Sequence, residues 1–178
     1  MNRMFLRAIA ALMLLTSLHC FAAAPAGGER RLLYVAEPGI RDYLEYGGHG
    51  VLVFDMDNGH KFVRRIATAG VDEKGKPLNV KGVCASAATK RLYVSTTRTI
   101  MCLDLLTDKP LWEKAYEGGC DRLAISPDGR QFYVPSLEGD HWHLVDAMTG
   151  EVLKKIVPKS GAHNTIYGLD GAHAYLAG

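Results

Sequence analysis

The sequence predicts an all-β protein, a β-propeller of four-stranded antiparallel blades in which about three and a half blades are present. The first observation is a repeat, because strand-like tyrosines recur at Tyr93, Tyr133 and Tyr175, 40 and then 42 residues apart. The second is that each full repeat holds four short runs rich in Val, Ile, Leu, Tyr and Phe. The third is that Gly, Pro, Asp and Asn separate these runs, as in hairpin turns. An eight-stranded sandwich is the alternative, but it would not explain runs that recur in one order at a constant interval.

Residues 1–26 have the composition of an export signal. Two arginines are followed by an apolar run over residues 8–21 and then by small residues. This order predicts a secretory signal peptide, with cleavage between Ala22 and Ala26 and a periplasmic or extracellular location. The apolar run is too short for a stable membrane span. A lipoprotein anchored through Cys20 is the alternative, disfavoured by the bulky histidine before that cysteine.

The remaining chain, residues 27–178, is formally neutral. Without the two arginines of the signal peptide, 19 basic side chains face 19 acidic ones, and no basic cluster stands out. Binding to DNA or RNA depends largely on neutralising phosphates, so we expect no nucleic-acid partner. Three cysteines remain, Cys84, Cys102 and Cys120, an odd number that cannot be fully paired within the chain. We expect buried thiols, and one disulfide with one free thiol is the alternative.

The propeller segment divides into units whose strands can be followed in order along residues 27–178. Blade 1, about residues 31–70, begins at what would be the second strand of a blade and holds three strands. Blades 2 and 3, about residues 80–117 and 120–158, hold four each, and blade 4 starts with two at about residues 163–178. In blade 3 the expected strands are residues 120–126, 131–136, 141–146 and 151–157.

The joints between strands carry turn chemistry. In "SPDG", Pro127 fixes the backbone for a type I turn, Asp128 can cap it and Gly129 takes the left-handed position. In "DAMTG", Asp146 can accept hydrogen bonds from backbone amides and Gly150 closes the turn. The blade 2 counterpart of "SPDG" is "SAAT", which keeps the length without the Asp or the Gly. We therefore interpret these turns as structural and expect no chemistry at them.

One repeat carries a resemblance to a known family. The third unit, "RQFYVPSLEGDHWHLVDAMTGEVLKKIVPKSG", has a "YV" strand, a polar loop, a "V-D-x-x-T-G" turn and a short basic-apolar strand. It resembles the blade of the YVTN family of β-propellers, which "RLYVSTTRTIMCLDLLTDKPLWEKAYEGG" matches less strictly. The resemblance covers residues 31–178 and implies an exported or surface-layer protein without specifying its function. It also implies a ring of about seven blades, so we expect the sequence to be the N-terminal half of a longer protein. Two half rings closing as a dimer are the alternative.

Strand direction assigns the connections to two faces. Consecutive strands of a blade are antiparallel, so first-to-second and third-to-fourth turns share one face. Two long insertions, residues 37–50 and 71–79, fall on the opposite face with the second-to-third and blade-to-blade connections. Long loops on one rim of a rigid scaffold commonly carry binding sites, so we expect any site on this loop-rich face.

The innermost strands begin on the loop-rich face, beside the central channel. A gapless alignment of the units places Lys81, Asp121 and His163 at one equivalent position, and Arg122 and Asn164 at the next. We predict a ligand-binding site at this channel mouth, formed by all five side chains. The alternative is that these groups are solvated or pair across blades, for example Lys81 with Asp121.

The sequence favours binding over catalysis. No serine nucleophile elbow, phosphate-binding glycine loop or paired-carboxylate site occurs, so no catalytic residue is predicted. The predicted function is a non-enzymatic exported scaffold that binds a partner protein or a small ligand on its loop-rich face. A propeller enzyme with its site at the channel mouth, either a lactonase or a quinone- or metal-dependent oxidoreductase, is the alternative.

No cofactor is predicted, and no compact metal-ligand motif occurs. His49, His141 and His163 all map to the loop-rich face, and they are the candidate ligands of an alternative metal hypothesis. His141 and His143 are two residues apart on one expected strand, so their side chains should share a face.

Overall fold

The computed structural model describes residues 29–37, 49–68 and 70–178. The predicted signal peptide, residues 1–26, and most of the first insertion lie outside the described residues. The described chain forms antiparallel strands and one short 3-10 turn, η1, and it contains no helix long and apolar enough to cross a membrane. The bounds are β1 Leu32–Glu37, β2 Gly50–Asp55, η1 Met56–Asn58, β3 Lys61–Ile66, β4 Val80–Ser86, β5 Arg91–Thr96, β6 Thr99–Asp104, β7 Pro110–Ala115, β8 Ala124–Ile125, β9 Gln131–Pro135, β10 Trp142–Asp146, β11 Val152–Ile156, β12 Asn164–Tyr167 and β13 Ala174–Ala177.

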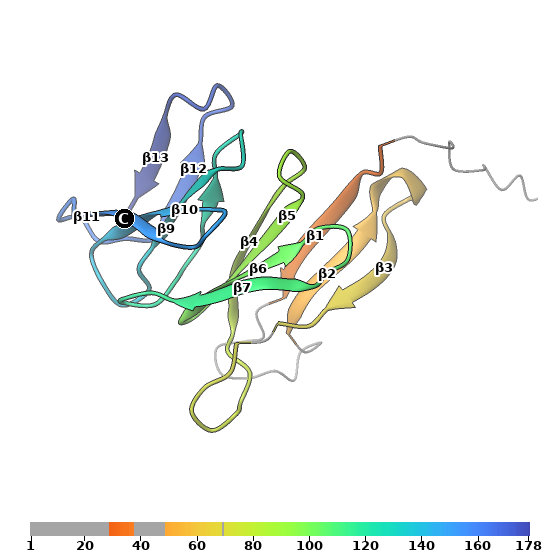
Figure 1. The fold of residues 1–178 in the computed structure, drawn as a ribbon, viewed down its shortest axis with the longest axis horizontal. Helices are drawn as coiled ribbons and strands as arrows, with labels where there is room; N and C mark the ends of the chain where they lie inside the picture. The colour runs from red at the N-terminus through yellow and green to blue at the C-terminus, as the bar shows by residue number, and fades with distance from the viewer. Residues whose placement is uncertain (1–28, 38–48, 69) are drawn as a thin grey trace, which may run out of the picture.

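The strands form separate sheets that follow one another along the chain (Figure 1). Their orders are β1-β2-β3, β4-β5-β6-β7, β8-β9-β10-β11 and β12-β13, with every pair antiparallel. We call these sheets blades 1 to 4. The predicted all-β class and the four-stranded antiparallel blades are confirmed. The innermost strands β4, β8 and β12 are neighbours, as they would be around a propeller channel.

Tight turns and long connections lie at opposite ends of the blades. In Figure 1 the β4–β5 and β12–β13 turns are at the top, whereas the loop that precedes β4 is at the bottom. Turns of blades 2, 3 and 4 line one shared depression through residues 85–88, 125–127 and 167–169. The first-to-second turns of successive blades therefore share a face.

Blade 3 differs from the prediction at its first strand. The sequence predicts a strand over residues 120–126, but β8 is only two residues long. The missing part bonds partly to blade 2, because Cys120 N donates to Thr97 O at 3.3 Å and Ser95 Oγ donates to Asp121 O at 2.8 Å, whereas Asp121 N still donates to Pro135 O of β9 at 3.0 Å. Backbone groups used between blades are not available for a regular ladder within blade 3.

The core lies between successive blades. Phe132 of β9 is fully buried, with its ring centroid 5.4 Å from that of Tyr93 and 6.4 Å from that of Trp112, both in blade 2. The cluster between blades 2 and 3 comprises Tyr93, Ile100, Cys102, Tyr116, Cys120, Leu123, Phe132, Val134, Val145 and Ala147. The cluster that joins blades 1 and 2 comprises Val51, Val53, Ile66, Val80, Leu92, Val94, Met101 and Leu103.

The three described cysteines are free thiols, so the one-disulfide alternative is wrong. Cys102 and Cys120 are buried and Cys84 is partly exposed. Burial raises the pKa of Cys120 to about 12 and also raises the pKa of Cys84 and of Cys102. These side chains therefore act as small apolar groups of the core, because a thiol with a raised pKa is a poor nucleophile.

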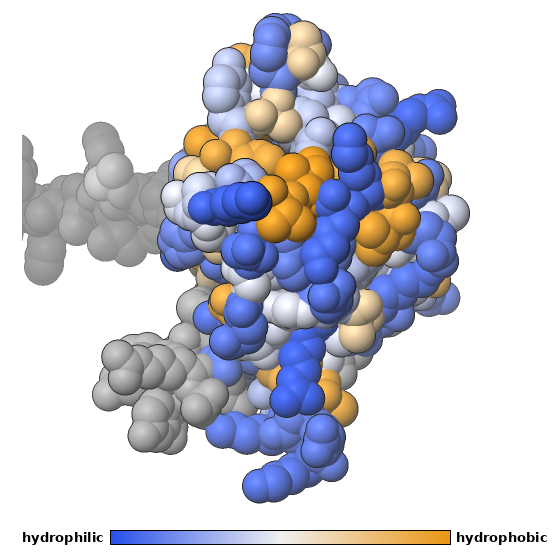
Figure 2. All heavy atoms as spheres, turned by 90° about the vertical axis from the view of Figure 1, so that its left-hand side faces the viewer, coloured by the Kyte–Doolittle hydropathy of each residue, from blue (hydrophilic) through white to orange (hydrophobic). Residues whose placement is uncertain are grey.

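The end of the molecule formed by β11, β12 and β13 carries exposed apolar side chains. Figure 2 faces this end and shows apolar patches on either side of a hydrophilic ridge. The large apolar side chains exposed on these strands and their connections are Val152, Leu153, Val157, Ile166, Leu169 and Tyr175.

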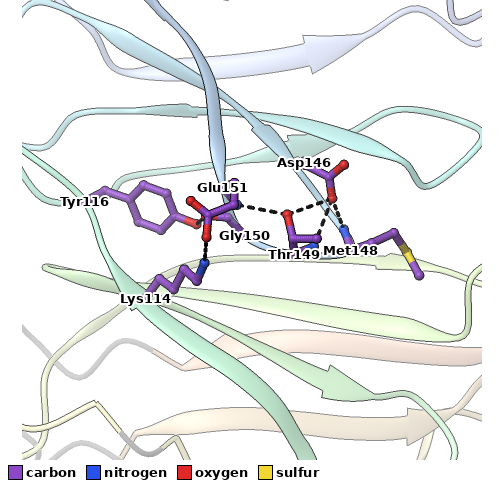
Figure 3. Close-up of polar contacts among 7 residues, drawn as sticks. All are labelled: Lys114, Tyr116, Asp146, Met148, Thr149, Gly150 and Glu151. Atoms are coloured by element: carbon purple, nitrogen blue, oxygen red, sulfur yellow. Dashed lines mark hydrogen bonds and ion pairs between the residues drawn. The ribbon is translucent and has the colours of Figure 1, made fainter.

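The third-to-fourth turn of blade 3 is built on Asp146. Its Oδ1 accepts hydrogen bonds from Met148 N at 2.8 Å, Thr149 N at 2.9 Å and Thr149 Oγ1 at 3.1 Å (Figure 3). Asp104 accepts three equivalent hydrogen bonds in blade 2. That turn has no glycine, and Asp108 itself takes the left-handed conformation with φ of 57°.

The same turn fastens blade 3 to blade 2 (Figure 3). Tyr116 Oη donates to Gly150 O at 2.9 Å, and Lys114 forms an ion pair with Glu151. The equivalent turn of blade 2 accepts from Arg64 Nη2 of blade 1 at 2.9 Å. These contacts agree with a structural role for the turn.

Replacing Asp146 by alanine should lower the free energy of unfolding by about 1–2 kcal/mol, because three donors lose their shared acceptor. Asp146→Asn is the matched control, since it keeps an oxygen at the same position and should cost less than half as much. Urea denaturation measures both variants. Equal losses would show that the turn depends on the charge of Asp146 and not on its acceptor oxygen.

Candidate functional site

The predicted channel-mouth residues lie at the inner ends of blades 2, 3 and 4. Asp121 and Arg122 precede β8, His163 precedes β12, and Lys81 is the second residue of β4. Blades 2 and 3 come close here, because a Cβ added to Gly82 would lie 3.2 Å from the Cα of Arg122. The position of these residues follows from the packing of the inner strands and not from a local motif.

Three of the five side chains form one chain of polar contacts across blades 3 and 4. The Nδ1 atom of His163 lies 3.1 Å from Oδ2 of Asp121, and its Nε2 atom lies 2.8 Å from Nη1 of Arg122. A carboxylate only accepts and a guanidinium only donates. Nδ1 of His163 therefore carries the proton that faces Asp121, and Nε2 accepts from Arg122.

The three side chains of this hydrogen-bonded chain differ in their exposure to solvent. The Asp121 side chain is only 10% exposed, whereas that of His163 is 60% exposed and Arg122 lies at the surface. The buried carboxylate orients the imidazole, and the imidazole orients the guanidinium. The guanidinium of Arg122, at the outer end of this hydrogen-bonded chain, is therefore a cation that faces solvent in a fixed position.

The other two predicted residues, Lys81 and Asn164, are not part of this hydrogen-bonded chain. Among the described residues Lys81 forms no ion pair with Asp121, and the ladder between β4 and β5 shifts register at Lys81. The Oδ1 atom of Asn164 accepts from the backbone N of Thr165 at 2.9 Å, so it is used locally. The structure therefore shows the pairing across blades that was the alternative reading, but between Asp121 and His163 and not between Lys81 and Asp121.

The three histidines of the metal hypothesis are not brought together in the described part of the chain. His163 is used by Asp121 and Arg122. His141 instead lies with His143 and Glu117, and one potential ligand atom from each of these three residues lies within 4.8 Å of the others. His49 is not part of that group.

The sequence predicted two of the three residues of this second cluster. The period of two along a strand placed His143 beside His141, and their ring centroids are 4.8 Å apart. Glu117 was missed because it lies in the connection between blades 2 and 3 and reaches the pair only through blade packing. No spacing rule within one blade could have found it.

Two open grooves lie between blades 2 and 3. One, of about 420 Å³, runs along the outer strands β7 and β11 and reaches Tyr116, Glu117, His143 and Lys155. The other, of about 570 Å³, lies on the loop-rich face. Its lining comprises Thr97, Arg98, Ala115, Tyr116, Gly118, Gly119, Leu137 and Glu138. Neither of these two grooves is lined by Asp121, Arg122 or His163.

Comparison with solved structures supports the architecture. The hydrazine synthase of Kuenenia stuttgartiensis is similar with a TM-score of 0.60 and 17% sequence identity over 72% of this chain. The present chain spans only 36% of the length of that chain. No family model and no curated protein matches the sequence. At this identity the similarity shows a β-propeller-like fold alone, so the YVTN resemblance stays a prediction.

Proposed function

We propose that the protein is an exported, non-enzymatic β-propeller scaffold that binds a small acidic ligand on its loop-rich face, with Arg122 as the contact group and His163 holding Arg122 in position. The observation that carries the proposal is the polar chain from buried Asp121 to exposed Arg122. A guanidinium has five N–H donors, and only one of Arg122 is used by His163. The remaining donors suit a carboxylate or phosphate, and an acidic side chain of a partner protein would use the same contact.

Binding fits this geometry better than acid–base catalysis. A histidine that acts as a general base needs a ring nitrogen free to reach the substrate. Both nitrogens of His163 are occupied, one by Asp121 and one by Arg122. We therefore do not propose the enzyme alternative for this position. The periplasmic or extracellular location in the proposal rests on the signal peptide predicted for residues 1–26.

Replacing Arg122 by glutamine should weaken the binding of small anions at least about tenfold, because charge-assisted hydrogen bonds are lost. The probes are a panel of dicarboxylates and inorganic phosphate, measured by calorimetry after a screen for raised melting temperature. Arg98→Gln is the matched control, since Arg98 is also exposed. Its Nη1 atom lies 3.9 Å from Oε1 of Glu73. Absence of binding across the panel, or equal losses in the two variants, would contradict the proposal.

A further inference from the structure

We propose that Glu117, His141 and His143 form a binding site for a divalent transition-metal ion, with Zn²⁺ as the fitting ion, between blades 2 and 3. One ligand atom from each residue lies within 4.8 Å of the others. The site is separate from the Asp121–His163–Arg122 chain and does not depend on the function proposed above.

Blade packing brings the three residues together. His143 lies on β10 and His141 directly precedes that strand, so both side chains are on the same side of it. Trp142 between them is on the opposite side, where its Nε1 donates to Thr165 Oγ1 of blade 4 at 3.1 Å. Glu117 follows β7 and approaches the histidines from blade 2.

The buried ring of His143 carries the strongest evidence for the site. It is 4% exposed, and its buried Nδ1 has no hydrogen-bond partner in the described structure. A buried polar atom without a partner destabilises the fold, and coordination of a metal ion would remove that cost. A metal ion requires an unprotonated ring nitrogen, and the unpartnered Nδ1 of His143 can offer one.

His141 is 5% exposed and already held as metal-bound histidines usually are. Its Nε2 lies 3.2 Å from the carbonyl oxygen of Glu117, which can only accept, so Nε2 carries the proton and Nδ1 keeps a lone pair. Two glycines make room for the ring. A Cβ on Gly139 would lie 2.8 Å from Nδ1 of His141, and a Cβ on Gly118 would lie 3.1 Å from its Cε1.

Glu117 supplies a charged and adjustable third ligand. Its side chain is 70% exposed, and its Oε1 accepts from Lys155 Nζ at 2.8 Å. Zinc holds nitrogen and oxygen ligands at about 2.0–2.2 Å, so its ligands lie roughly 3.4 Å apart. The flexible Glu117 side chain can close the remaining distance. Two histidines and one carboxylate also leave a fourth position for water, and the groove of about 420 Å³ gives access from solvent.

Two variants that break the same ion pair provide the test. Glu117→Gln removes a ligand, whereas Lys155→Gln removes only the partner of Glu117. The tag-free full chain is titrated with Zn²⁺ by calorimetry in the presence of a competing chelator. We expect one ion per chain, an affinity at least about tenfold lower in Glu117→Gln, and an unchanged or higher affinity in Lys155→Gln.

A second measurement checks the buried ligand. Co²⁺ bound to two histidines and a carboxylate should give visible absorption bands, which His143→Gln should abolish while circular dichroism shows an unchanged fold. His173→Gln controls for chance binding at an exposed histidine, because Nδ1 of His173 lies 3.8 Å from Oδ2 of Asp170. This variant should leave the Co²⁺ absorption bands unchanged. Lack of one-to-one uptake, or equal affinity losses in Glu117→Gln and Lys155→Gln, would overturn the proposal.

Discussion

Replacing Phe132 by alanine should lower the free energy of unfolding by about 3–5 kcal/mol. Phe132 is fully buried at the junction of blades 2 and 3, where it packs against the rings of Tyr93 and Trp112. Truncation loses the buried apolar surface and leaves a cavity between two sheets that cannot readily collapse. Urea denaturation followed by tryptophan fluorescence measures the change, because Trp112 reports on the same cluster.

Phe62→Ala is the matched control for this prediction. Phe62 lies on β3 and is 53% exposed, so the same truncation there should cost less than about 1 kcal/mol. If both variants were destabilised equally, blade 3 would not pack against blade 2 through the face of β9 that carries Phe132.

Replacing Gly119 by alanine should destabilise the fold more than the loss of a left-handed glycine alone would. Gly119 lies in the connection between blades 2 and 3 with φ of 73°, and a Cβ there would lie 2.3 Å from the carbonyl oxygen of Thr97. The left-handed conformation alone costs a non-glycine residue about 1–2 kcal/mol. Relief of the clash must also move the backbone that leads to Asp121.

Gly75→Ala separates the two contributions. Gly75 has nearly the same φ, 75°, but an added Cβ would meet nothing within 4 Å. Its variant should lose only the conformational cost, and Gly119→Ala should lose clearly more in the same denaturation experiment. Equal losses would contradict the close approach of the blade 2–blade 3 connection to Thr97.

The fold was largely predictable because its information is local and repeated. Four short apolar runs and their turns recur in each unit, and β9, β10 and β11 begin and end within one residue of the expected runs. The first strand of blade 3 was not predictable in this way. Its backbone is held by Ser95 and Thr97 of another blade, and such contacts leave no pattern in the strand's own sequence.

The candidate site was predictable in position but not in its contacts. A gapless alignment placed Asp121 and His163 at equivalent points of successive blades, and the structure brings them within hydrogen-bond distance. Lys81 stands at the same aligned position, yet the register shift in β4 sets it apart. Glu117 joins His141 and His143 only through the packing of two blades.

The hydrogen-bond chain from Asp121 through His163 to Arg122 is tested most directly by the ¹⁵N chemical shifts of the His163 ring at mildly alkaline pH. Because Asp121 accepts at Nδ1 and Arg122 donates at Nε2, a protonated Nδ1 and an unprotonated Nε2 are expected. Asp121→Asn should weaken this preference, and Arg122→Gln should shift the Nε2 signal. A ring protonated at Nε2, with shifts that ignore both substitutions, would contradict the packing of blade 3 against blade 4 and the binding site built on it.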